Sequence, residues 1–105
     1  MHKQLKIVLN GSWPECADNW EGTITVNGQE AEFYGDGDAA RGWFVEYCFI
    51  WEMKVYRLQL FVDNKIYLFW ENGNSMWSNP VYKHNLTITL NGKDAKPNLI
   101  DSVFA

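Results

Sequence analysis

The chain has 105 residues, enough for one domain, and we expect residues 1–105 to form a single unit with its own core. Its composition of 47% hydrophobic and 21% charged residues excludes an intrinsically disordered chain. The net charge of −4 and the scattering of the nine basic residues argue against a binder of nucleic-acid phosphates, which needs a basic stripe.

Four Asn-Gly dipeptides divide the chain into candidate hairpins, at Asn10, Asn27, Asn72 and Asn91. Asn and Gly suit the two positive-φ positions of a type I′ turn. Strand-like residues adjoin these turns over residues 4–9, 23–26, 29–34, 65–70 and 86–90. We therefore expect an all-β chain built from antiparallel hairpins.

The hairpin at Asn27-Gly28 has the clearest register. A two-residue loop pairs Val26 with Gln29, and the same ladder extends to Gly22 opposite Phe33. One face of this hairpin is then largely apolar and the other entirely polar, as a half-buried hairpin requires.

Part of this hairpin recurs near the end of the chain. Residues 23–32 and residues 87–96 are identical at six of ten positions, including Thr-Ile-Thr and Asn-Gly. We favour convergence on good hairpin residues over duplication, because the spacing is too irregular for a repeat protein.

Residues 35–38, Gly-Asp-Gly-Asp, resemble the start of a calcium-binding loop. Ala40, Arg41 and Tyr47 stand where that pattern needs a ligand, a glycine and a glutamate. The calcium pattern therefore fails, and we expect a flexible polar loop between strands that can still contact a partner.

The segment from residue 43 to residue 70 is almost entirely strand-forming. At a period of two residues, one face of its first strand carries only apolar and aromatic side chains: Trp43, Val45, Tyr47, Phe49 and Trp51. We expect this segment to form the centre of the fold, because both of its faces are rich in apolar residues.

A hairpin ends this segment, with a three-residue loop over residues 63–65. That loop pairs Val62 with Ile66 and makes Arg57 and Glu71 cross-strand neighbours on one face, with an expected coupling of ~0.2–1 kcal/mol. A two-residue loop would mix charged with apolar side chains, so the separation of the two faces favours three residues.

The reverse face of this hairpin carries Phe61, Tyr67 and Phe69, which should not face water as one patch. A second sheet, the C-terminal tail or another subunit must cover them. If no part of the same chain does so, a two-fold symmetric homodimer is the simplest cover, and we expect such a dimer.

Helical signals are weak and fall on residues 14–19 and 97–104, each with room for one or two short turns. The predicted architecture is therefore a hairpin-rich antiparallel sandwich or partly open barrel of about seven to nine strands. No apolar run approaches the ~20 residues of a membrane span, and no signal peptide is visible. We expect a cytoplasmic protein with reduced thiols and no membrane contact.

Residues for catalysis or metal binding are few. His2, His84, Cys16 and Cys48 are isolated, without the spacing of a zinc site, so we expect no metal or cofactor. No serine lies in a nucleophile motif, and Glu46 and Glu52 would lie about 20 Å apart along one strand. The sequence favours a non-catalytic protein, with an enzyme of dispersed site residues as a weaker alternative.

Tryptophan is abundant, with six residues in the chain. Trp43, Trp51 and Trp70 fit core positions, whereas the other three lie at turns, where they either stack on a partner or plug the end of the fold. The candidate interaction surface comprises the three turn tryptophans and the reverse face of the last hairpin: Trp13, Trp20, Trp77, Phe61, Tyr67 and Phe69.

Small size, acidity, surplus aromatic residues and missing catalytic motifs favour a protein-interaction module. An inhibitor, immunity or adaptor protein of a phage or mobile element fits this description, with another protein or a second copy as partner. The alternative is a β-barrel lined by aromatic residues that binds a small apolar or sugar ligand. A closed apolar cavity would favour that alternative, and an exposed aromatic patch would favour the interaction module.

Overall fold

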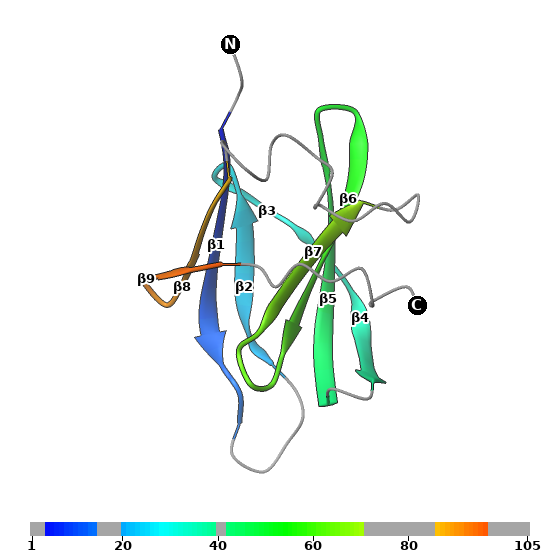
Figure 1. Cartoon of the computed structure of the whole chain (residues 1–105), viewed down its shortest axis with the longest axis vertical. Helices are drawn as coiled ribbons and strands as arrows, with labels where there is room; N and C mark the ends of the chain where they lie inside the picture. Colours follow the sequence, from blue (N-terminus) through cyan, green and yellow to red (C-terminus); the bar gives the residue numbers. More distant parts are fainter. Residues whose placement is uncertain (1–3, 15–19, 40–41, 71–85, 97–105) are drawn as a thin grey trace.

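The computed structural model describes residues 4–14, 20–39, 42–70 and 86–96, which form nine β-strands and no helix (Figure 1). In chain order the described strands are β1 (Leu5–Ser12), β2 (Glu21–Val26), β3 (Gln29–Glu30), β4 (Glu32–Ala39), β5 (Gly42–Trp51), β6 (Lys54–Phe61), β7 (Ile66–Trp70), β8 (Leu86–Leu90) and β9 (Lys93–Ala95). The all-β prediction is confirmed. The predicted helical turns at residues 14–19 and 97–104 lie, apart from Pro14, outside the described residues.

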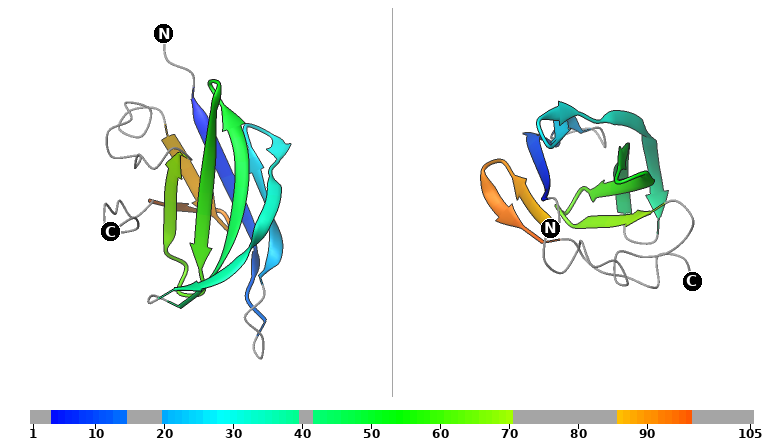
Figure 2. Two further views of the ribbon diagram at one scale, coloured as in Figure 1. Left: turned by 90° about the vertical axis from the view of Figure 1, so that its right-hand side faces the viewer. Right: turned by 90° about the horizontal axis from the view of Figure 1, so that it is seen from above.

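The strands form two sheets that face each other (Figure 2). The first sheet has the order β3-β2-β1-β8-β9 and the second has the order β4-β5-β6-β7. The described strand pairs are antiparallel, apart from β1 and β8, which are parallel. The described strands do not close into a barrel, which agrees with the predicted sandwich or partly open barrel.

Alternating apolar residues explain why the two sheets pack. In β1, Leu5, Ile7 and Leu9 are buried and the residues between them are not, which gives the strand one apolar face. The first sheet contributes Leu5, Ile7, Leu9, Ile24, Val26 and Ile88 to the core. The second sheet contributes Val45, Tyr47, Phe49, Trp51, Tyr56, Leu58, Leu60, Ile66 and Leu68. In each sheet we call the side that faces the other sheet the inner face.

The predicted inner face of β5 is confirmed from Val45 to Trp51, but the prediction for Trp43 is wrong. Trp43 is 40% exposed, because it lies at the start of β5, beyond the last layer of the core. Its neighbours there, Asp38 and Val62, are exposed as well. The side chain of Trp70 lies outside the described residues.

The turn at Asn27-Gly28 is confirmed, with φ of 50° and 85° and with Val26 opposite Gln29. The predicted extension to Gly22 and Phe33 is wrong. The ladder between β2 and β3 ends near Ala31, whose N–H donates to the carbonyl of Ile24 at 2.9 Å. The chain then crosses to the second sheet, where β4 pairs with β5, and Ala31 is buried at the crossing.

Replacing Gly28 by valine is expected to destabilise the protein by more than ~1 kcal/mol, because a β-branched residue fits positive φ badly. No atom lies within 4 Å of the position of a Cβ at Gly28, so the loss has no steric part. Urea denaturation measures it, with Gly35→Val as control, since Gly35 has equally open surroundings and no positive φ. Equal stability of the two variants would contradict the turn assignment.

Two further turns connect the strands of the second sheet. Glu52 and Met53, both at positive φ, join β5 to β6. The loop between β6 and β7 has the predicted three residues, but it spans residues 62–64, as shown by the 2.9 Å hydrogen bond from the N–H of Phe61 to the carbonyl of Lys65. Asn64, with φ of 69°, supplies the left-handed residue that ends this loop.

The predicted pairing of Arg57 with Glu71 is therefore wrong, and Arg57 pairs with Phe69. The predicted pair of Val62 and Ile66 is also replaced, by Leu60 and Ile66. Moving a three-residue loop by one position changes each cross-strand partner by two residues and leaves every side chain on its predicted face. The separation of apolar from polar faces therefore could not reveal the wrong register.

The acidic segment at residues 35–38 is part of strand β4 and not a flexible loop, which corrects that prediction. Asp36 lies opposite Val45, and Asp38 lies opposite Trp43. The intervening Gly37 lies under the ring of Phe44, whose Cζ would be 2.6 Å from a Cβ at that position. Gly37 thus leaves space for the ring of Phe44 on the outer face. The charges of Asp36 and Asp38 disfavour pairing of this edge strand with other chains.

The repeated Thr-Ile-Thr segments occupy equivalent places, because β2 and β8 flank β1 on opposite sides. The Asn after each segment binds the backbone of β1: Asn27 Oδ1 accepts from Lys6 N–H at 2.8 Å, and Asn91 Oδ1 accepts from Gly11 N–H at 2.8 Å. The shared residues perform the same structural task at both ends of β1, which explains their repetition.

Candidate functional site

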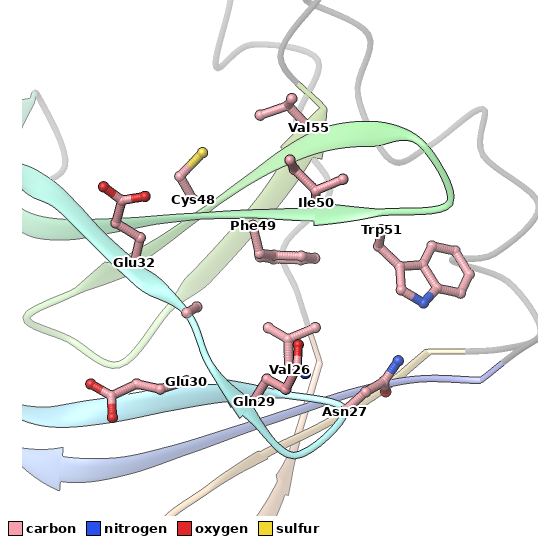
Figure 3. Close-up of a pocket in the computed structure, with 11 residues that line it drawn as sticks. Val26, Asn27, Gln29, Glu30, Glu32, Cys48, Phe49, Ile50, Trp51 and Val55 are labelled. Carbon is pink, nitrogen blue, oxygen red and sulfur yellow. The ribbon is translucent and has the colours of Figure 1, made fainter.

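An open groove with a volume of about 470 Å³ lies between the β2–β3 turn and the β5–β6 hairpin (Figure 3). The described residues that line it are Val26, Asn27, Gln29, Glu30, Ala31, Glu32, Cys48, Phe49, Ile50, Trp51 and Val55. The groove exists because β4 pairs with β5 only up to Glu32 opposite Cys48, whereas β5 continues to Trp51. One edge of β5 is thus left without a described neighbour beyond Cys48.

The floor of the groove is apolar and fixed in position. Phe49 and Trp51 point from the β5–β6 hairpin toward the β2–β3 turn (Figure 3), and each is 8% exposed. Tyr56 holds both rings, with a stacked contact to Phe49 at 5.5 Å between ring centroids and an edge contact to Trp51 at 6.3 Å. These contacts hold the aromatic floor in place opposite the buried Val26.

The rim of the groove exposes apolar side chains to water. Ile50 is 72% exposed, and Met53 at the tip of the hairpin is 97% exposed. Glu52 and Met53 both have positive φ, which costs about 1–2 kcal/mol for each non-glycine residue. Strain and exposed apolar surface at one hairpin tip do not stabilise the folded chain, and such features gather at binding sites.

The described lining of the groove is negatively charged. Its described lining includes the carboxylates of Glu30 and Glu32 and no basic side chain. Between Lys6 and Lys54 the sequence holds nine acidic residues and one basic residue, Arg41. The remainder of the chain has more basic than acidic residues. Sequence reasoning missed this asymmetry, although the printed sequence contains it.

Four of the six predicted interaction residues have described side chains, and none of these four lines the groove. Phe61 and Tyr67 are 3% and 4% exposed and lie on the outer face of the second sheet, where Phe61 contacts Phe44 and Tyr67 at 5.0 and 5.1 Å between ring centroids. Both rings are therefore already buried within a single chain. The side chain of Phe69 and all of Trp77 lie outside the described residues.

Trp13 and Trp20 form a pair near the end of the sandwich away from the groove, with 5.5 Å between their ring centroids. Both are half-buried and pack against the core. The ring of Trp20 lies against Gly11 and Gly22, two glycines that face each other across β1 and β2. Part of each ring is therefore covered by the core, and part of each stays exposed.

Tyr47 lies near this pair, and its hydroxyl donates to the carbonyl of Gly22 at 3.4 Å. Burial raises the pKa of Tyr47 above its ordinary value of 10.0, and the charge of Glu30 adds to the increase. The folded state thus favours the neutral phenol, and this contribution to stability is lost as the pH rises above the pKa of the unfolded state.

We expect the unfolding free energy of the native protein to fall more steeply between about pH 9 and about pH 11 than that of Tyr47→Phe, which has no phenol to ionise. Urea denaturation at several pH values measures both slopes. Parallel slopes for the two proteins would contradict the assigned shift in the Tyr47 pKa.

Polar side chains on the outer face of the second sheet form a cluster and bind one another. Glu46 accepts a hydrogen bond from Gln59 at 3.1 Å and forms an ion pair with Arg57 at 3.9 Å. Arg57 also donates to the hydroxyl of Tyr34 at 3.0 Å and lies 4.2 Å from the centre of that ring. Glu46 is therefore engaged in structure, whereas Glu52 lies in the exposed β5–β6 turn.

The described residues include no group of three or more His, Cys, Asp or Glu side chains that could hold a metal ion. Cys48 lines the groove, whereas Cys16, His2 and His84 lie outside the described part of the chain. Within that part, no helix has the length and apolar character needed to cross a membrane. No protein-family model, curated protein or solved structure matches the chain.

Proposed function

We propose that this protein is a non-catalytic interaction module that binds a segment of a partner protein in the groove between the β2–β3 turn and the β5–β6 hairpin. The observation that carries this proposal is the exposure of Ile50 in the lining of a groove whose floor is formed by Phe49 and Trp51. Met53, in the adjoining turn, extends this apolar surface. Apolar anchors around a preformed groove are typical of protein-binding surfaces.

An inhibitor, immunity or adaptor role fits such a module, because each needs one accessible surface and no chemistry of its own. The carboxylates of Glu30 and Glu32 at the groove add charge selectivity, since they attract basic partners and repel acidic ones.

Two other occupants are weaker candidates. A small ligand fits the volume of the groove, which lies within the roughly 300–1,000 Å³ of small-molecule sites, but the open side of the groove buries a ligand incompletely. A second copy of the chain is another candidate, although Phe61 and Tyr67, two of the three residues on which the dimer prediction rests, are buried. Sedimentation at high micromolar concentration decides whether copies associate.

The test compares two matched variants of the full chain in capture experiments with an extract of the cells that make the protein. Ile50→Asp places a charge on the rim of the groove, and Val62→Asp places the same charge on an exposed residue at the other end of β5 and β6. We expect Ile50→Asp to reduce capture of a specific partner by at least about tenfold and Val62→Asp to leave it unchanged. A partner captured equally by both variants would contradict the proposal.

A further inference from the structure

Among the described strands, the edge of β5 beside the groove is open to one more strand. The N–H of Val62 donates to the carbonyl of Trp43 at 3.0 Å, so Trp43 is a residue of β5 whose backbone groups face β6. Because this orientation alternates along an antiparallel ladder, even-numbered residues of β5 direct their N–H and C=O groups toward β4. Cys48 is paired with Glu32 of β4. Ile50 is the next residue of β5 whose backbone groups point to this side, and it has no partner among the described strands.

The chain itself creates this open position. β4 cannot continue along β5 past Cys48, because Ala31 carries the chain across to the first sheet, where its N–H bonds to Ile24. The N–H and C=O of Ile50 therefore point along the line that β4 would have followed. An exposed strand edge of this kind binds extended peptides by backbone hydrogen bonds.

We propose that an extended segment of the partner protein adds to β5 as an antiparallel strand at Ile50, in line with β4, and that apolar residues alternate with Lys or Arg in this segment. The inference rests on the proposed function, because it takes the groove as the binding surface. It adds the conformation of the bound segment and its residue pattern.

The alternation follows from the two faces of the sheet. A residue opposite Ile50 has its side chain on the outer face, where Glu32 also lies, since Glu32 is opposite Cys48. A basic side chain there meets a carboxylate. The next residue along the segment points the other way, toward Phe49 and Trp51, and an apolar side chain there covers the aromatic floor.

Charge favours a basic partner segment over the chain's own C-terminal tail as the occupant of this edge. Residues 97–105 contain Asp101 and no basic residue, so their sequence does not have the proposed pattern. The carboxylates of Glu30 and Glu32 in the lining disfavour acidic segments from any source and favour the approach of basic ones.

A synthetic peptide tests the inference on the full chain. The probe is an end-capped peptide in which Val and Lys alternate, and binding is followed by NMR through the amide signal of Ile50. We expect replacement of each Lys by Glu to weaken binding by at least about tenfold. We expect Glu32→Gln in the protein to weaken it by about two- to fivefold.

Backbone methylation distinguishes strand addition from side-chain contacts. In an antiparallel added strand, the lysines opposite Ile50 direct their N–H groups toward β5, and the valines direct theirs toward water. We expect N-methylation of the lysines to weaken binding by at least about tenfold and N-methylation of the valines to change it less than about threefold. Equal effects of the two methylations, or equal affinity for the Lys and Glu peptides, would overturn the inference.

The outcomes also separate this inference from the proposed function. If Ile50→Asp abolishes capture of a cellular partner but the two N-methylated probes bind alike, the groove binds proteins through side chains, and only strand addition is wrong. If Ile50→Asp changes neither partner capture nor peptide binding, both proposals are wrong.

Discussion

Replacing Gly22 by alanine is expected to destabilise the protein by about 3 kcal/mol, at the upper end of the range for overpacked sites. A Cβ at this position would lie 2.4 Å from the carbonyl oxygen of Asn10 and 2.4 Å from the ring of Trp20. The ring can shift, but the carbonyl belongs to the ladder between β1 and β2, so relief requires the two strands to separate. Urea denaturation at neutral pH measures the loss.

Gly35→Ala is the control for this prediction, because no atom lies within 4 Å of the position of its Cβ. We expect that variant to lie within about 0.5 kcal/mol of the native protein, as substitutions in open surroundings do. A Gly22→Ala protein as stable as Gly35→Ala would mean that β1 and β2 do not approach as closely as described.

Leu58→Ala is expected to destabilise the protein by about 2–5 kcal/mol. Leu58 is fully buried on the inner face of β6 and lies opposite Tyr47 of β5 and Leu68 of β7. A cavity between two sheets closes poorly, because strands paired on both sides cannot move inward. Thermal and urea denaturation give the difference in the free energy of unfolding.

Ile50→Ala is the matched comparison, since it also truncates a branched aliphatic residue in a neighbouring strand of the same sheet. Ile50 is 72% exposed, so we expect a loss below about 0.5 kcal/mol. A loss as large as that of Leu58→Ala would show that Ile50 is part of the core and would remove it from the rim of the groove.

The sequence predicted local features of the fold well. The turn at Asn27-Gly28 and the buried face of residues 45–51 follow from turn chemistry and from a two-residue period, and both depend only on neighbouring residues. The faces of β6 and β7 were also predicted correctly, although the register was not. The position of the left-handed residue, Asn64, fixes that register.

The choice of distant partners was not predictable in the same way. No local pattern marks Ala31 as the place where the chain changes sheets, or pairs β8 with β1 in parallel. Several arrangements of the same strands would place the apolar residues on one face and the polar residues on the other. The crossing at Ala31 depends on contacts between residues far apart in the sequence, which a single sequence does not reveal.

The groove was missed for this same reason, because it is a consequence of where β4 leaves β5. The two-residue period puts Ile50 on the face opposite Phe49 and Trp51, but both faces of this segment were expected to be covered. The nine acidic residues between Lys6 and Lys54 were the one visible signal of a charged surface. The aromatic residues suggested instead, Phe61 and Tyr67, are buried because the outer face of the second sheet is itself partly packed.

Native-state amide hydrogen exchange at Ile50 tests most directly whether β5 presents an open edge. The N–H of Phe49 lies in the ladder with β6, and the N–H of Ile50 faces the groove. We predict that the Ile50 amide exchanges faster than the Phe49 amide by on the order of a hundredfold, because local exposure replaces a ladder hydrogen bond. Equal protection of the two amides in the isolated protein would contradict an open edge at Ile50 and, with it, the proposed site for an added strand.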